Sequence, residues 1–210
     1  MAHPGERKTI GEVAGQRVVR VVIAEDEAIV RLDLKEILEE EGYEVVGETG
    51  RGDEAVVLVR EHEPDLAILD IKMPGLDGLA AAREIAADRK AAVLILTAFS
   101  QRNLIEEARD AGALAYLVKP FQKAELIPAI EVALGRFQEM KALEEENRSL
   151  EEQLEVRKLV DRAKGKLMDE CKLSEYDAFR FIQTNAMRLR LTMKEVALQV
   201  IDGQLWPEKA

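Results

Sequence analysis

The sequence is poor in cysteine and aromatic residues, and it has no long apolar run. Its 210 residues include one cysteine, one tryptophan and only 4% aromatic residues. A single cysteine, Cys171, excludes an internal disulfide framework and favours a reducing compartment. The first residues, MAHPGERKTIGEVAGQR, contain no apolar core of a signal peptide, and no stretch is long enough to cross a bilayer. We therefore expect a cytoplasmic protein.

Charge is distributed unevenly along the chain, whose net charge is −11. Residues 1–155 hold 19 Lys and Arg against 33 Asp and Glu, a net charge of −14. Residues 156–210 hold 11 against 8, a net charge of +3. A change of sign is typical of segments with different partners, although +3 is also ordinary for a solvated surface. An apolar content of 47% is enough to build a core.

Short apolar runs alternate with segments of helical spacing between residues 18 and 135. Runs rich in Val, Ile and Leu are typical of strands that are buried on both faces. Strands alternating with helices predict an α/β fold with a parallel sheet covered on both faces. The five runs are 18–26, 43–48, 64–70, 91–98 and 113–119. The first helical segment has apolar residues at Ile29, Leu32, Leu34, Ile37 and Leu38, and Gly42 follows as its stop signal.

Polar side chains stand where these strands end. Glu25 and Asp26 follow the first strand, Asp70 ends the third, Thr97 ends the fourth and Lys119 ends the fifth. The carboxyl ends of parallel strands share one edge of a sheet, so these groups should converge there. Clustered carboxylates repel unless a cation joins them, and oxygen ligands suit Mg²⁺. A carboxylate beside a metal can attack phosphorus to form an acyl phosphate, whose oxygens a hydroxyl and an ammonium can hold.

Residues 18–135 resemble the receiver domain of bacterial two-component response regulators. The resemblance rests on the acidic pair Glu25-Asp26, on Asp70 with the following segment 73–78 (MPGLDG), and on Thr97-Ala98 and Lys119-Pro120. It implies a flavodoxin-like, doubly wound sheet of five parallel strands. It further implies a sensor histidine kinase as phosphoryl donor and Asp70 as the phosphoacceptor. The implied Mg²⁺ ligands are Glu25, Asp26, Asp70 and the backbone carbonyl of Lys72, and the implied switch residues are Thr97, Tyr116 and Lys119.

A phosphatase of the haloacid dehalogenase type is an alternative reading of the same acid. Such enzymes also use a strand-end Asp and Mg²⁺, but they need a second acid two residues later. Here that position holds Lys72, which cannot serve as a carboxylic acid at neutral pH. The sequence therefore favours a regulatory protein over an enzyme.

The stretch from 136 to 160 is dense in Glu, Leu, Gln and Lys, which favour helix. Its apolar and neutral positions recur at spacings of 3 and 4, the pattern of a coiled-coil seam, and Asn147 falls where a polar residue fixes register. The alternative is a single charged helix that acts as a spacer. We favour a weak dimer that phosphorylation strengthens. The seam residues are Met140, Leu143, Asn147, Leu150 and Leu154.

Residues 156–210 have the pattern of three helices. Segments 174–177 (SEYD) and 192–195 (TMKE) read as capping boxes that open the second and third helices. We expect Ala178, Phe179, Ile182 and Ala186 to be buried in the second helix. A basic stripe for phosphates would be formed by Arg162, Lys164, Lys166, Arg180, Arg188 and Arg190. Charge alone favours the alternative, in which these six residues are solvated cations scattered among acids.

This region resembles the ANTAR domain, an RNA-binding output module of bacterial antiterminators. The resemblance rests on the segments 163–168 (AKGKLM), 178–179 (AF), 186–188 (AMR) and 196–197 (VA), together with Ser174. It implies binding to paired RNA hairpins that prevents a terminator from forming. RNA loops are commonly read by stacking and by base-edge contacts. The stacking candidates are Tyr176, Phe179, Phe181 and Trp206, of which Phe179 is expected in the core.

The sequence thus predicts a phosphorylation-controlled transcription antiterminator in four parts. They are a flexible tail (1–16), a receiver domain (17–136), a helical linker with a short coiled coil (137–155) and a three-helix RNA-binding domain (156–210). One alternative is a DNA-binding regulator with a variant helix-turn-helix. The third helix, beginning TMKEVALQV, argues against it, because its one base-reading candidate, Gln199, comes late. A regulator that binds only proteins is the second alternative.

Overall fold

The structure is a computed structural model that describes residues 17–98 and 102–207. The flexible tail expected at residues 1–16 lies outside this described part of the chain. The chain forms two compact units, residues 1–139 and 140–210, which are taken separately below. Within the described ranges, no helix is both long enough and apolar enough to cross a membrane.

The first unit contains a parallel sheet of five strands in the order β2-β1-β3-β4-β5. The predicted α/β fold with a doubly wound sheet is confirmed. Every residue of β3 and β4 is buried, because these strands lie inside the sheet and are covered on both faces. The strands are β1 (Arg20–Ala24), β2 (Glu44–Thr49), β3 (Leu66–Asp70), β4 (Ala92–Thr97) and β5 (Ala115–Val118).

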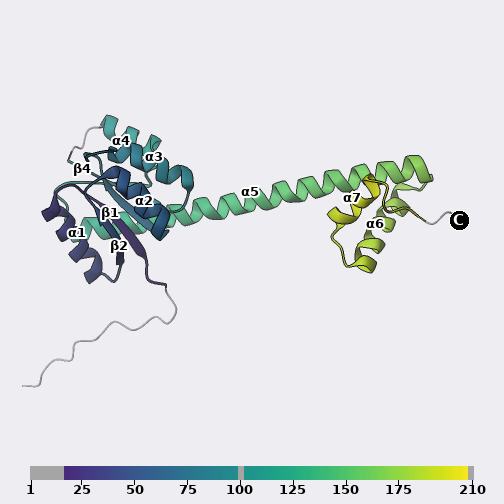
Figure 1. The fold of residues 1–210 in the computed structure, drawn as a ribbon, viewed down its shortest axis with the longest axis horizontal. Helices are drawn as coiled ribbons and strands as arrows, with labels where there is room; N and C mark the ends of the chain where they lie inside the picture. The colour runs from purple at the N-terminus through teal and green to yellow at the C-terminus, as the bar shows by residue number, and fades with distance from the viewer. Residues whose placement is uncertain (1–16, 99–101, 208–210) are drawn as a thin grey trace, which may run out of the picture. The chain divides into compact units, whose positions relative to one another are not determined.

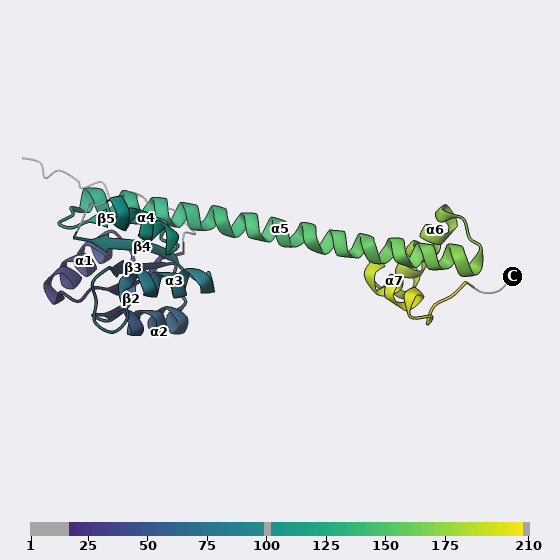
Figure 2. The ribbon, with the colours of Figure 1, turned by 90° about the horizontal axis from the view of Figure 1, so that it is seen from above.

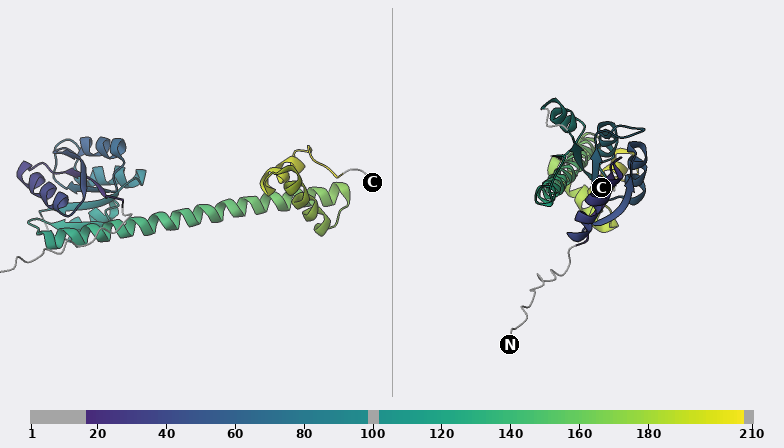
Figure 3. Two further views of the ribbon diagram at one scale, coloured as in Figure 1. Left: turned by 90° about the horizontal axis from the view of Figure 1, so that it is seen from below. Right: turned by 90° about the vertical axis from the view of Figure 1, so that its left-hand side faces the viewer.

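Helices cover both faces of this sheet. The four shorter helices are α1 (Ala28–Glu40), α2 (Gly52–His62), α3 (Gly78–Asp88) and α4 (Arg102–Asp110). Apolar residues of α2, α3 and α4 form one core cluster with alternate residues of β1, β3 and β4. The long helix α5 (Lys123–Cys171) begins on the opposite face, as Figures 2 and 3 show. Its residues Leu126, Ile130 and Ala133 are fully buried there.

Helix α1 is buried along a narrow stripe. Leu34 and Leu38 are fully buried, but Ile29 is 85% exposed and Leu32 is 57% exposed. Successive helical residues are separated by roughly 100°, so Ile29 points almost directly away from Leu38. The predicted helix is present, but only part of its apolar set faces the core.

The second unit consists of the end of α5 (Lys123–Cys171), α6 (Glu175–Leu189) and α7 (Met193–Ile201), seen together in Figure 1. The predicted three helices are confirmed. Each contributes to one small core, with Leu167 from α5, Ile182 from α6 and Val196 from α7 fully buried. Leu205 and Trp206, beyond α7, pack against the same core.

Local capping explains where α6 and α7 begin. The Ser174 hydroxyl accepts a hydrogen bond from Asp177 N at the start of α6. Thr192 and Glu195 form a complete capping box at the start of α7, as predicted. Both devices satisfy backbone N–H groups that have no partner inside the helix.

The expected burial of Phe179 is wrong. Ala178 and Ile182 are fully buried, and Ala186 is 8% exposed, but Phe179 is 41% exposed. The buried stripe of α6 is centred between Ala178 and Ile182, so Phe179 falls at its edge. Asn185 instead occupies a buried position that the apolar pattern did not assign to the core.

Candidate functional site

Asp70 ends β3, and the segment that follows folds back against it. Gly78 N donates a hydrogen bond to the Ile71 carbonyl at 2.8 Å, and the Asp77 carboxylate caps α3 by accepting from Ala80 N at 2.8 Å. A Cβ atom on Gly78 would overlap the carbonyl of Asp70. Gly75 has φ +79°, a conformation that glycine adopts readily. The segment 73–78 therefore needs Gly78 to pass this close to the strand end and Gly75 to turn the chain.

Three carboxylates gather at this end of the sheet. One oxygen each from Glu25, Asp26 and Asp70 lies within 4.8 Å of the others. Glu25 is fully buried and Asp70 is 5% exposed, whereas Asp26 is exposed. Lys119 Nζ lies 2.6 Å from Glu25 Oε2 and 3.1 Å from Asp70 Oδ1. The strand ends thus bring together residues that are up to 94 positions apart in the sequence.

The local electrostatics follow from this burial. Loss of hydration raises the pKa of Asp70 above its ordinary value, although Lys119 opposes the rise. Burial likewise raises the pKa of Glu25, and the nearby Asp70 charge adds to the effect. For Lys119, burial favours the neutral amine, but hydrogen bonds to Glu25 and Asp70 outweigh it and raise the pKa. The site therefore holds its negative charge at a free-energy cost that a further cation would reduce.

Thr97 lies beside a cavity at this end of the sheet. It is the last residue of β4 and is 3% exposed. It lines the cavity together with Asp70, Lys72 and Lys119. The backbone of Lys119 is tied to β4, because Lys119 N donates to the Thr97 carbonyl at 2.7 Å. A hydroxyl and an ammonium thus line the cavity with Asp70, and groups of this kind can hold the oxygens of an oxyanion.

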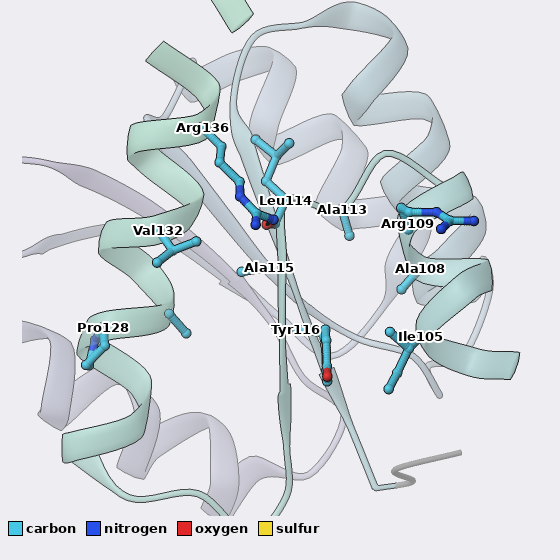
Figure 4. A pocket seen from close by; sticks show the side chains of 11 residues that line it. Ile105, Ala108, Arg109, Ala113, Leu114, Ala115, Tyr116, Pro128, Val132 and Arg136 are labelled. Carbon is cyan, nitrogen blue, oxygen red and sulfur yellow. Dashed lines mark hydrogen bonds between the residues drawn. The ribbon is translucent and has the colours of Figure 1, made fainter. Parts of the chain in front are cut away.

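Tyr116 lies away from the carboxylates, in a surface groove between α4, β5 and α5. Figure 4 shows its side chain beside Ile105 of α4, with Pro128 and Arg136 of α5 on the other side of β5. The Tyr116 side chain is 44% exposed, so its ring is outside the core. Arg136 donates a hydrogen bond to the Leu114 carbonyl at 2.9 Å. These contacts tie α5 to the chain just before β5.

The seam predicted on α5 is largely solvent-exposed. Leu143, Leu150 and Leu154 are 61%, 55% and 52% exposed, respectively. Asn147 is also exposed, and Met140 is half-buried. The five residues therefore form an unburied, mainly apolar stripe along one helix.

The six basic candidates of the second unit fall into two groups. Lys164 lies 2.9 Å from Asp161 and 2.8 Å from Glu175. Lys166 donates to the Ile201 carbonyl at 2.6 Å and lies 5.1 Å from the centre of the Trp206 ring. Both lysines are half-buried, and their contacts join parts of the three-helix unit to one another. The remaining four, Arg162, Arg180, Arg188 and Arg190, are exposed.

Comparisons with known proteins match both parts of the chain. Residues 21–131 match the response regulator receiver domain, and residues 148–201 match the ANTAR domain. The transcriptional regulatory protein PdtaR of Mycobacterium tuberculosis is 60% identical over 183 residues, which cover 87% of this chain and 89% of the relative. The chain belongs to the response regulator family. More specifically, it is a phosphorylation-regulated response regulator that carries an RNA-binding ANTAR domain.

Solved structures agree with the fold of the receiver domain. The signal receiver domain of the putative response regulator NarL from Mycobacterium tuberculosis aligns with a TM-score of 0.55 at 30% identity, covering 57% of this chain and 98% of that one. The receiver domain of the sensor histidine kinase PA1611 from Pseudomonas aeruginosa PAO1 aligns with a TM-score of 0.52, also at 30% identity. That alignment covers 57% of this chain and 99% of the other, which has a magnesium ion coordinated in its active-site cleft.

The acidic cluster of this response regulator fits a magnesium ion chemically. Mg²⁺ prefers oxygen ligands and is commonly held by one or two carboxylates with waters and phosphate oxygens. Glu25, Asp26 and Asp70 supply only oxygen, and burial of two of them makes added positive charge favourable. Such a cluster is typical of Mg²⁺ binding in receiver domains.

Arg31 is a site residue that the sequence analysis missed. Its Nη1 donates to the Glu25 carbonyl at 2.5 Å, and Glu27 N donates to Glu25 Oε1 at 3.2 Å. These bonds hold the loop between β1 and α1, from which Glu25 and Asp26 project. An arginine on the first turn of the helix after an acidic pair is a weak signal, because exposed helical arginines are common.

Proposed function

We propose that this response regulator is a transcription antiterminator that is switched by phosphorylation of Asp70. A sensor histidine kinase donates the phosphoryl group, and the second unit binds RNA hairpins that would otherwise form part of a terminator. The observation that carries the proposal is the placement of a buried carboxylate, Asp70, beside Lys119 and Thr97 in a chain that ends in an ANTAR domain.

In the proposed transfer, an oxygen of Asp70 attacks the phosphorus of a phosphohistidine on the kinase. The bond between phosphorus and the histidine nitrogen breaks, and that nitrogen keeps the electron pair. Lys119 and the Thr97 hydroxyl then hold the oxygens of the aspartyl phosphate. We propose Glu25, Asp26, Asp70 and the Lys72 carbonyl as ligands of Mg²⁺, which when bound offsets the negative charge of the carboxylates and the phosphoryl group.

The proposed signal passes from this site to the surface groove. As Thr97 moves toward the phosphoryl group, it vacates space into which Tyr116 turns. This changes the face formed by α4, β5 and the start of α5. The exposure of Tyr116 supports this step, because a ring that lies outside the core can turn inward.

The proposed output is a dimer formed along α5. Residues 137–155 serve as the helical linker between the receiver domain (17–136) and the RNA-binding domain (156–210). The exposed leucines of the seam support pairing of two copies, because burying them removes apolar surface from water. Two RNA-binding units on one dimer engage two hairpins, and avidity raises the affinity without new contacts.

Duplex DNA reading by α7 is a weaker candidate. The base-reading residue expected there, Gln199, is half-buried, and its carbonyl accepts hydrogen bonds from Gln204 N and Leu205 N. It comes late in α7, whereas recognition helices read bases from their first turns. The geometry therefore favours RNA over the major groove of DNA.

Binding to a tandem-hairpin RNA and to a DNA duplex of equal length tests the proposal. Each measurement is made with and without acetyl phosphate and Mg²⁺, over a series of salt concentrations. We expect hairpin binding to strengthen on phosphorylation and the Asp70→Asn variant to lose this response. Equal RNA binding by phosphorylated wild type and Asp70→Asn would refute the switch. Absence of hairpin preference in both states would refute the RNA output.

A further inference from the structure

The outward side of α6 carries a continuous row of exposed side chains without a carboxylate. The row recurs at intervals of 3 and 4 residues, so its members share one side of the helix, opposite the buried Ala178 and Ile182. We call this row the α6 outer face; it consists of Tyr176, Arg180, Gln183, Thr184 and Met187.

Two members of the α6 outer face are unusually exposed for apolar side chains. Met187 is 72% exposed and Tyr176 is 68% exposed, more than any other large apolar residue described in the second unit. Arg180 lies between them in sequence, and its guanidinium carbon is 5.8 Å from the centre of the Tyr176 ring. An aromatic ring, a thioether and an arginine together offer flat surfaces for stacking and a charge for phosphate.

The neighbouring acids are directed into local contacts. Glu175 accepts from Lys164 at 2.8 Å, and the Asp177 carboxylate accepts from the Ser174 hydroxyl at 2.6 Å. These contacts draw the two carboxylates of the first turn toward Lys164 and the helix cap. The α6 outer face therefore carries positive charge within residues 156–210, a segment whose net charge is +3.

A buried amide holds a further arginine at the edge of this face. Asn185 is 5% exposed, and its Nδ2 donates to the Phe181 carbonyl at 2.8 Å. Its Oδ1 accepts from Arg188 Nη2 at 2.7 Å. A polar side chain in a small apolar core costs free energy unless its groups are bonded, and here one of its two bonds orients a surface guanidinium.

We propose that the α6 outer face, with Arg188 at its edge, binds the unpaired loop bases of an RNA hairpin. The inference rests on the proposed function and names the surface that performs it. Residues 176 to 187 span about 16 Å of helix, the length of four to five stacked nucleotides. Tyr176 and Met187 stack on bases, Arg180 and Arg188 bind phosphates, and Gln183 pairs with a base edge.

RNA binding by full-length variants tests this surface. The probes are a fluorescently labelled tandem-hairpin RNA and a loopless RNA duplex of the same length. We expect Tyr176→Ala to weaken hairpin binding roughly 5- to 150-fold and to remove the preference for hairpin over duplex. We expect Arg180→Ala to weaken binding and to reduce the slope of log Kd against log salt by about 0.7, the value for one single-stranded phosphate contact.

Matched controls separate this surface from general charge and apolarity. Arg157→Ala removes another exposed arginine, from α5, and Leu198→Ala shortens an exposed side chain of α7. Both should bind the hairpin within twofold of wild type, and circular dichroism should show unchanged melting for all four variants.

The outcomes distinguish this inference from the proposed function. Hairpin binding by wild type that persists unchanged in Tyr176→Ala and Arg180→Ala would overturn the inference and leave the RNA output standing. Failure of wild type to prefer the hairpin would overturn both. Loss of self-association in the two variants, measured by sedimentation, with retained RNA binding would assign the α6 outer face to a protein contact instead.

Discussion

Replacing Gly78 by alanine should damage the phosphoryl-acceptor site through the backbone alone. The added Cβ would overlap the carbonyl of Asp70 and come within 3.0 Å of Ile71 Cα. Both are main-chain atoms at the end of a fully buried strand, so no flexible side chain can move aside. Overpacking of this kind costs about 1–3 kcal/mol, and we expect the free energy of unfolding to fall by an amount near the upper end.

The same overlap should slow phosphorylation. Relief of the contact moves either Gly78 or the end of β3, and the second movement displaces the Asp70 carboxylate from Lys119. A displacement of about 1 Å can cost a reaction roughly 100-fold in rate. Urea denaturation followed by circular dichroism measures the stability, and phosphate-affinity gels with acetyl phosphate and Mg²⁺ measure the rate of modification.

Gly135→Ala is the matched control, because it makes the same chemical change but is expected to raise stability rather than lower it. Gly135 lies in α5, and a Cβ there would meet no atom within 4 Å. Alanine favours helix over glycine by about 1 kcal/mol, so this variant should be more stable than wild type and should be phosphorylated at the normal rate. If Gly78→Ala unfolded at the wild-type urea concentration and accepted phosphoryl normally, the close approach of segment 73–78 to Asp70 would be wrong.

Three further changes test other parts of the structure. Because burial raises the pKa of Asp70, the native state binds a proton at pH values where the unfolded chain has already released it. In EDTA, the free energy of unfolding should therefore fall as pH rises from about 4 through the raised pKa. Urea titrations should show a smaller fall for Asp70→Asn. Thr192→Ala should lower stability by about 1 kcal/mol through loss of the α7 capping box, whereas an unchanged thermal midpoint would contradict that role. Arg190→Gly should raise stability by about 1 kcal/mol, since Arg190 has φ +57°, and a lower midpoint would show that its side chain contributes more than its backbone costs.

The sheet and the acidic cluster were predictable because they depend on patterns that are short in sequence. Buried parallel strands read as apolar runs, and the chain order alone brings their carboxyl ends to one edge. Asp70, Glu25 and Lys119 therefore meet as expected, although they are far apart in the sequence. Only the rule about strand ends predicts their contact. Their individual roles in phosphoryl transfer stay predictions.

The surface of the second unit was less predictable, since it depends on contacts between helices. Nothing in the segment AKGKLM distinguishes a lysine that binds RNA from one that binds the end of another helix. Lys166 reaches the Ile201 carbonyl, 35 residues away, where the negative end of the α7 dipole favours a cation. Phe179 was misplaced for a related reason: a stripe of apolar residues defines the buried side of a helix, but not where that side ends.

The basic residues of the second unit are of two kinds: Lys164 and Lys166 contact other parts of the unit, whereas the four arginines are exposed. This difference bears on how phosphorylation could control RNA binding. If Lys164 and Lys166 mainly stabilise the three-helix unit, the α6 outer face is present whether or not Asp70 is phosphorylated. One such face of about 16 Å offers few contacts, so a single copy should bind a hairpin weakly. Pairing along α5 would double the number of faces and make the second binding event intramolecular, which raises affinity by as much as ~10²- to 10⁴-fold. In that case phosphorylation would need to change only the pairing of α5, and the α6 outer face would be the same in both states.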